Sequence, residues 1–148
     1  MTKQRLQDKL IDFQRDIIRL SQNLQSQDQA CQDREDHLLL ELILVLDAFE
    51  NIFKNLEAKE AAFEKSVRRA LKSFQSIQRK LLRILKEQGV EKIEFPDGKA
   101  VVGLCKVVET RAVEGLAEGQ IIAIVSHGYQ CDTRVLRPAE IITVANRT

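Results

Sequence analysis

Apolar residues in the first part of the chain recur at regular intervals of three or four positions. Over residues 6–24 the spacings alternate between four and three, which is the a/d pattern of a coiled coil. This pattern predicts a long helix with one face that needs a partner helix. The residues of this stripe, which we predict to form a dimer interface, are Leu6, Leu10, Phe13, Ile17, Leu20 and Leu24.

The same register becomes polar over residues 27–34 and is strongly apolar again from Leu38 to Leu46. We expect the helix to weaken or unwind locally over residues 27–34, because the pairing surface is lost there. The apolar side chains from Leu38 to Leu46 point all around the helix, which is typical of the centre of a bundle. Four further interface positions are predicted from this segment and the turns after it: Leu38, Leu42, Val45 and Phe49.

A second apolar stripe predicts another helix from residue 63 to Gln88. Residues 55–62 are charged and lose the register, which favours a turn between the two helices. Gly89 stands where a left-handed residue ends a helix at little steric cost. The second stripe adds three residues to the predicted dimer interface: Phe74, Ile77 and Leu81.

The first helix carries an apolar stripe much longer than the second helix is able to cover. The uncovered part must either remain in solvent or meet another chain, and a large exposed apolar surface is unusual in a monomer. We therefore predict a homodimer in which paired helices lead into a four-helix bundle. The heptads alone leave open whether the chains pair in parallel or antiparallel.

All six glycines and both prolines lie after residue 88, where the pattern changes to short runs rich in Val and Ile. Such runs, bounded by turn residues, predict strands. The expected strands are residues 91–95, 100–110, 120–126 and 141–145, with a shorter run at Val135. The predicted class is α+β, with a long coiled-coil helix (1–37), a helix-bundle dimerisation region (38–89) and a small all-β domain (90–148).

Charge and cysteine content add weaker expectations about partners and location. The 23 basic and 22 acidic residues give no overall excess that would favour nucleic acid, although residues 59–92 carry ten basic and four acidic side chains. The longest apolar stretch is about half of the roughly 20 residues needed to cross a bilayer. Three separated cysteines predict neither a disulfide framework nor a zinc ribbon, and they favour a reducing, cytoplasmic location.

Residues suited to catalysis or metal binding are sparse. The chain has two histidines, His37 and His127, and the only close metal-ligand spacing joins His127 to Cys131, which is too few ligands for a site. None of the phosphate-binding glycine loops, the GxSxG motif or the HExxH motif occurs. We expect no catalytic residue, no metal and no cofactor.

The segment 128–145 resembles the closing β-hairpin of the GrpE family, the nucleotide exchange factors of DnaK-type heat-shock chaperones. In that family a Gly-Tyr pair is followed by a short turn and then by Arg-Val-Leu-Arg-Pro-Ala, as are Gly128 and the run Arg134–Ala139 here. The segments 44–50 and 89–93 are similar to two further family segments, in the same order.

Other positions depart from the family pattern. Around Asn23 the chain reads Asn-Leu-Gln-Ser-Gln, whereas the family has a basic Asn-Phe/Tyr-Arg-Lys-Arg cluster on its long helix. Gln88 stands where the family has an aromatic residue before the Gly-Val-Glu junction. The chain therefore resembles a divergent member of the family.

The resemblance implies a co-chaperone that binds the ATPase domain of a DnaK-type chaperone and promotes ADP release without being an enzyme. It also implies a homodimer, with neither nucleic acid nor a membrane as partner. Arg134 and Arg137 are three positions apart and lie on opposite faces of a regular strand, so at most one should face the chaperone. The residues implied to serve chaperone binding are Gly89, Gly128, Tyr129, Arg134, Arg137, Pro138 and Ala139.

Three alternatives remain open from the sequence. A coiled-coil structural or adaptor protein with no exchange activity explains the heptads and the missing catalytic motifs. A nucleic-acid-binding dimer would use the basic second helix, and its affinity would fall steeply with salt. An enzyme would have to assemble its site from scattered acidic residues or from a β-domain with few polar clusters.

Overall fold

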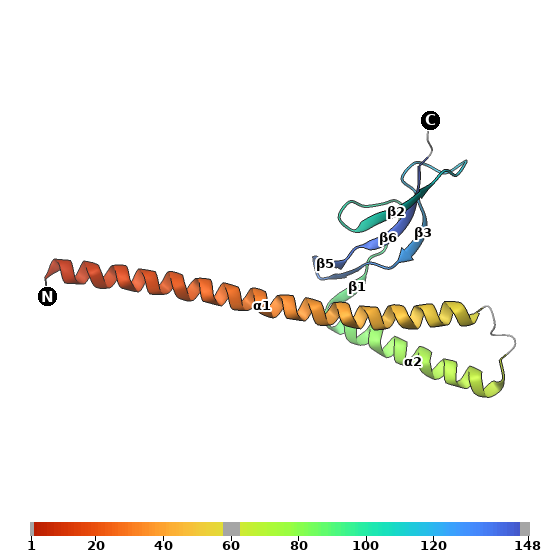
Figure 1. Ribbon diagram of the computed structural model, residues 1–148, viewed down its shortest axis with the longest axis horizontal. Helices are drawn as coiled ribbons and strands as arrows, with labels where there is room; N and C mark the ends of the chain where they lie inside the picture. The colour runs from red at the N-terminus through yellow and green to blue at the C-terminus, as the bar shows by residue number, and fades with distance from the viewer. Residues whose placement is uncertain (1, 58–62, 146–148) are drawn as a thin grey trace. The chain divides into compact units, whose positions relative to one another are not determined.

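The computed structural model describes residues 2–57 and 63–145 (Figure 1). Within these residues, two helices are followed by six short strands in two sheets. The predicted α+β class, with a long first helix and a small all-β region at the end, is confirmed. The chain divides into two units between Leu38 and Leu39.

Helix α1 runs from Lys3 to Glu57 without interruption. The local unwinding expected over residues 27–34 is therefore wrong. This segment contains neither Gly nor Pro, and Gln29 Nε2 donates a 2.8 Å hydrogen bond to Asp33 Oδ1 one turn further on. A polar seam removes a surface for pairing with another helix, but it leaves the backbone hydrogen bonds within the helix intact.

Helix α2 runs from Lys65 to Glu87 and ends as its sequence predicts. Gln88 is the C-cap, and its N–H donates to the carbonyl oxygens of Ile84 and Leu85. Gly89 has φ +78°, which confirms the left-handed conformation expected after the helix. The predicted turn at 55–62 overlaps the end of α1, and its residues 58–62 lie outside the described part of the chain.

One sheet packs on the helices, and we call it the inner sheet. It consists of β1 (Val90–Lys92), β4 (Tyr129–Cys131) and β5 (Arg134–Arg137), in the antiparallel order β1-β4-β5. Its buried side chains share one hydrophobic cluster with those of both helices, so apolar burial holds this sheet against them. The buried members of the cluster are Leu39, Ile43 and Leu46 of α1, Leu85 of α2, and Val90, Tyr129 and Cys131 of the sheet.

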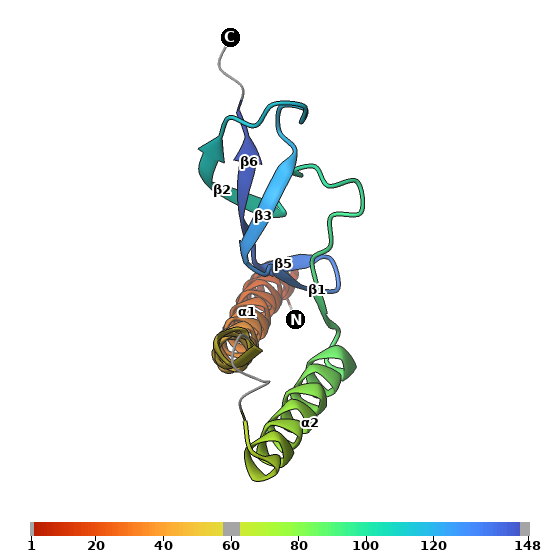
Figure 2. The ribbon, with the colours of Figure 1, turned by 90° about the vertical axis from the view of Figure 1, so that its right-hand side faces the viewer.

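The second sheet, which we call the outer sheet, contains β2 (Cys105–Arg111), β6 (Ala139–Val144) and β3 (Ile121–Ser126). Figure 2 shows β6 between the other two strands; it is parallel to β2 and antiparallel to β3. Five of the six β6 residues are buried, as expected for a strand covered on both faces.

The strand predicted over residues 100–110 is shorter than expected. Residues 101–104 form a turn, in which Leu104 N–H donates to Val101 O, and β2 begins only at Cys105. Gly103 has φ +87°, a left-handed conformation that is incompatible with a continuous strand. The Val-rich composition of this segment therefore gave the right class of structure but the wrong starting point.

Candidate functional site

The motif around Gly128 lies where the chain passes between the two sheets. Only His127 and Gly128 separate β3 from β4, and only Pro138 separates β5 from β6. A Cβ atom on Gly128 would lie 2.5 Å from the backbone nitrogen of Ala139 and 3.0 Å from Ile93 Cδ1. Gly128 is outside the left-handed region, so the site needs glycine for space and not for an unusual φ.

Tyr129 and Ala139, on either side of this crossing, are buried. Tyr129 belongs to the cluster that joins the inner sheet to the helices. Burial, together with the carboxylates of Glu50 and Asp47, raises the pKa of Tyr129 far above its usual value, so its hydroxyl stays neutral. Both side chains act by filling the interior, because neither has surface to offer a partner protein.

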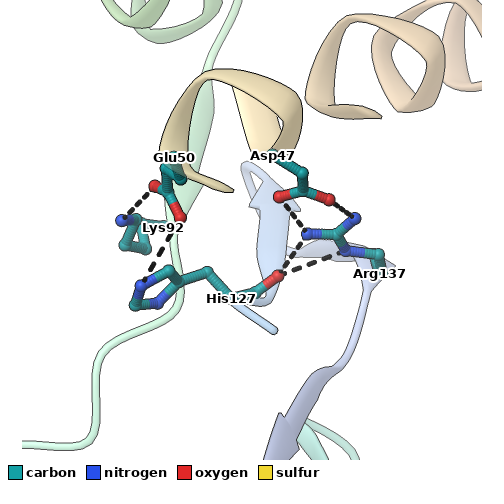
Figure 3. Close-up of polar contacts among 5 residues, drawn as sticks. All are labelled: Asp47, Glu50, Lys92, His127 and Arg137. Atoms are coloured by element: carbon teal, nitrogen blue, oxygen red, sulfur yellow. Dashed lines mark hydrogen bonds and ion pairs between the residues drawn. The ribbon is translucent and has the colours of Figure 1, made fainter. Parts of the chain in front are cut away.

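Arg137 joins the end of β5 to helix α1 (Figure 3). Its Nη1 lies 2.5 Å from Asp47 Oδ2, and its Nη2 lies 3.0 Å from Asp47 Oδ1, a two-pronged pair. Its Nε and Nη2 also donate to the carbonyl oxygen of His127, at 3.2 and 2.7 Å. The hydrogen bond to Asp47 raises the pKa of Arg137 further above its usual value, although burial opposes this.

The same guanidinium lies over the ring of Tyr129, with Cζ 5.6 Å from the ring centroid. At this distance a cation is attracted to the electron-rich face of an aromatic ring. The side chains of Arg137 and Asp47 are only 21% and 25% exposed, so water screens their attraction much less than it screens a surface pair. Arg137 is thus directed inward, to the junction of sheet and helix.

Glu50, one turn after Asp47 on α1, contacts two other segments of the β region (Figure 3). Lys92 Nζ donates to Glu50 Oε1 at 3.3 Å, and His127 Nε2 lies 3.9 Å from Glu50 Oε2. Burial and the positive charge of Lys92 lower the pKa of His127, and they outweigh the opposite effect of Glu50. His127 is therefore held mainly as the neutral imidazole.

Gly89 contacts the turn between β4 and β5. The N–H of Asp132 donates to Gly89 O at 3.1 Å, and a Cβ on Gly89 would lie 2.9 Å from Asp132 Oδ1. Asp132 itself has φ +52°, a conformation that Asp tolerates better than most residues. The end of α2 is thus fastened to the tip of the hairpin.

The other two predicted chaperone-binding residues are more accessible. Pro138 is exposed and Arg134 is half-buried at the start of β5. The motif therefore contains two kinds of residue: those that build the junction and those that border the surface. Four residues of this junction were not predicted from the sequence: Asp47, Glu50, Lys92 and Asp132. For Asp47 and Glu50 the available signal was a pair of acids three positions apart on a largely apolar helical segment.

The residues predicted for a dimer interface leave much apolar surface uncovered in the single chain. The six residues of the first stripe are between 59% and 66% exposed. In the segment 38–49, Leu38 and Val45 are exposed and Leu42 and Phe49 are half-buried, while the buried face is formed by other residues of the run. On α2, Phe74 and Ile77 are exposed and Leu81 is half-buried.

Within residues 2–57 and 63–145, no group of three His, Cys, Asp or Glu side chains is placed to hold a metal ion. Cys131 Sγ donates to Gln88 O, whereas His127 is directed to Glu50, so these two do not converge. Neither described helix is long and apolar enough to cross a membrane.

Comparisons with known proteins agree with the architecture. The GrpE family model matches residues 2–145. Protein GrpE of Thermotoga petrophila is 30% identical over 106 residues, covering 72% of this chain and 56% of that protein. Protein GrpE of Geobacillus kaustophilus is 32% identical over 108 residues, covering 73% and 48%. Protein GrpE of Clostridioides difficile is 27% identical over 106 residues, covering 72% and 48%.

The chain thus spans about half the length of the curated relatives it matches. The modest identities agree with the departures from the family pattern around Asn23 and at Gln88. The family model nevertheless extends over both helices and both sheets, and on this ground the chain belongs to the GrpE family as a divergent member.

Proposed function

We propose that this chain is a homodimeric co-chaperone that binds the ATPase domain of a DnaK-type chaperone and promotes the release of ADP. The observation that carries the proposal is the match of the GrpE family model to residues 2–145. The hairpin motif at Gly128–Ala139, which resembles the closing hairpin of the family, lies at the junction of the two sheets and agrees with the proposal. A cytoplasmic location, with neither nucleic acid nor a membrane as partner, is part of the same proposal.

The proposed activity is differential binding and needs no catalytic residue. The β region must bind the open nucleotide cleft of the chaperone better than the closed, ADP-loaded cleft, and so shift the population toward the open state. A shift from 1:99 to 99:1 requires about a 10⁴-fold difference in affinity. By reciprocity, ADP must weaken the complex by the same factor by which this protein weakens ADP binding.

We propose that the outer sheet and its border carry the chaperone-binding surface. Val107 and Val108 of β2 and Ile124 and Val125 of β3 are between 38% and 53% exposed, which leaves apolar area for a protein partner. Among the motif residues, Arg134 and Pro138 are proposed for direct contact. The others, Gly89, Gly128, Tyr129, Arg137 and Ala139, are proposed to hold this surface in shape.

The helices are proposed to form the dimer. The predicted stripe on α1 and the residues Phe74, Ile77 and Leu81 on α2 would meet a second copy, with a coiled coil over residues 1–37 and a four-helix bundle over 38–89. The β region, residues 90–148, would then remain available for the chaperone. Charged helix faces would stay in solvent, as expected for amphipathic helices.

The test is the rate at which fluorescent ADP leaves a DnaK-type chaperone from the same cell, measured over a range of concentrations of this protein. We expect a large acceleration that saturates with concentration. Arg134→Ala should raise the concentration needed for half-maximal acceleration, whereas Arg69→Ala, an exposed arginine of α2 outside the motif, should not. A well-folded dimer that leaves ADP release unchanged would instead support the alternative of a structural or adaptor protein without exchange activity.

A further inference from the structure

Two acidic residues of α1, Asp47 and Glu50, each hold a different part of the β region. Asp47 pairs with Arg137 at the end of β5, and Glu50 contacts Lys92 of β1 and His127 of the β3–β4 link (Figure 3). The three basic partners, Lys92, His127 and Arg137, come from three segments spread over residues 92–137, yet they face one short stretch of helix. We call these five side chains the ionic joint.

Apolar packing alone does not fix the orientation of the inner sheet on the helix. The cluster of Leu39, Ile43 and Leu46 with Tyr129 and Cys131 resists separation, because water would have to cover its apolar surface again. Burial of this kind is not directional, so it tolerates small rotations and shifts. A planar guanidinium held at two points by a carboxylate does specify a direction.

Arg137 is restrained on three sides. Asp47 holds its terminal nitrogens, the carbonyl of His127 accepts from Nε and Nη2, and the ring of Tyr129 lies under its Cζ. This geometry links α1, the β3–β4 connection and β4 through one side chain. Lysine would keep the charge but lose the fork.

The position of the outer sheet follows from that of the joint. The chain passes from one sheet to the other through His127–Gly128 and through Pro138, and these links cross without space for even one additional methyl group at Gly128. Ile93 N–H also donates to Gly128 O at 2.9 Å, which ties the end of β1 to the crossing. A rotation of the inner sheet on α1 would therefore be transmitted to β2, β3 and β6.

We propose that Asp47 and Arg137 are positioning residues that hold the outer sheet in one orientation on α1, so that its surface is presented ready for the chaperone. This inference rests on the proposed exchange function for its consequence, but not for its structural content. Without the pair, the β region would stay folded and attached while sampling several orientations. Apparent affinity for the chaperone would fall in proportion to the fraction of molecules in the competent orientation.

The test uses the full chain with Asp47→Asn, Arg137→Gln and the double variant, together with Arg137→Lys as the mildest change. The matched control is Arg83→Gln, because Arg83 and Glu87 also form an ion pair but are 68% and 64% exposed within a single helix, away from the proposed chaperone-binding surface. Far-ultraviolet circular dichroism of each variant checks that the helices and strands are retained. The double variant shows whether the two side chains act through each other.

The first readout is independent of the chaperone. Two fluorophores are attached to non-canonical residues that replace Ala48 of α1 and Thr110 of β2, both of which are exposed. Energy transfer in single molecules then reports the distribution of distances between α1 and the outer sheet. An excess of unlabelled chain ensures that a dimer contains at most one labelled chain. We expect one narrow distribution for the wild type and for Arg83→Gln, and a broader one for each variant of the pair. An unchanged distribution in Asp47→Asn and Arg137→Gln would overturn the inference.

The second readout is ADP release. If one molecule in ten keeps the competent orientation, the concentration for half-maximal acceleration should rise about tenfold, with little change in the maximal rate. If the distance distribution broadens but the concentration for half-maximal acceleration stays the same, the link between orientation and exchange would be overturned. A wild-type protein that does not accelerate release would overturn the proposed function, while the distance distributions would still decide whether the pair positions the sheet.

Discussion

Gly128 and Gly103 are required for different physical reasons, which makes them a matched pair of substitutions. An alanine Cβ at residue 128 would meet backbone atoms of Ala139, which cannot move without separating the two sheets. We expect Gly128→Ala to destabilise the protein by about 3 kcal/mol, at the upper end of overpacking effects. Gly103→Ala meets nothing within 4 Å but keeps φ +87°, so about 1 kcal/mol is expected.

Urea unfolding at one fixed protein concentration measures both changes from the shift in midpoint at constant slope. If the free energy of unfolding fell by the same amount in both variants, the junction would have to relax around the extra methyl group. The sequence indicated Gly128 only as part of a family motif. It did not predict a close approach to Ala139, because the contact joins residues whose spacing along the chain carries no local signal.

His127 gives a residue-level prediction about pH. Its pKa is lowered in the folded protein by burial and by Lys92, so the unfolded chain takes up a proton at a higher pH than the folded chain. The stability contributed by the neutral imidazole is therefore present above the ordinary pKa of about 6.5 and is lost as pH falls below it. Thermal or urea unfolding between pH 7.5 and 5.5 should show this loss.

His127→Gln should flatten that part of the stability profile, because glutamine has no proton to gain. His37→Gln is the control for the loss of a histidine elsewhere in the chain, because His37 lies on α1 outside the β region. A wild-type profile that is already flat over this range would contradict the assignment of the pH dependence to His127.

At the scale of elements, periodicity was sufficient to predict the helices and most strands. Two of the errors have local causes: good helix formers carry α1 through a polar seam at 27–34, and a left-handed Gly103 delays β2. The short strand β4 (Tyr129–Cys131) was not predicted from the hydrophobic pattern, and β1 ends at Lys92 instead of residue 95. The left-handed conformation of Gly89 was predicted correctly, because the end of a helix is determined by residues that are neighbours in the sequence. Strand order was not predictable in the same way, since β6 pairs with β2 and β3 through long-range contacts.

The ionic joint was likewise beyond the reach of sequence patterns. Arg137 stood in a recognisable motif, and Asp47 stood in another, but nothing in either segment indicated that they meet across 90 positions. Residues three apart lie on opposite faces of a regular strand, and this rule correctly indicated that Arg134 and Arg137 have different surroundings. Which of the two turns inward depends on the helix packed beneath β5.

At the scale of the whole molecule, the single chain leaves apolar surface that a second copy is proposed to cover. On α2, Phe74 and Ile77 are 50% and 53% exposed, and they belong to the stripe opposite the basic face. Replacing both with Asp would place two unpaired carboxylates in the proposed interface, at a cost of several kcal/mol. Since about 1.4 kcal/mol corresponds to a factor of ten, the dissociation constant of the dimer should rise at least a hundredfold.

Sedimentation velocity over a concentration series measures this change directly. The control is Ser76→Asp with Arg79→Asp, which also adds two carboxylates to α2 but on its exposed basic face, and this variant should remain a dimer. A wild-type protein that is monomeric throughout, or a Phe74→Asp, Ile77→Asp variant that stays dimeric, would show that this stripe is not the interface. A monomeric variant that still accelerates ADP release would separate the two proposals, because one ionic joint and one outer sheet would then suffice for exchange.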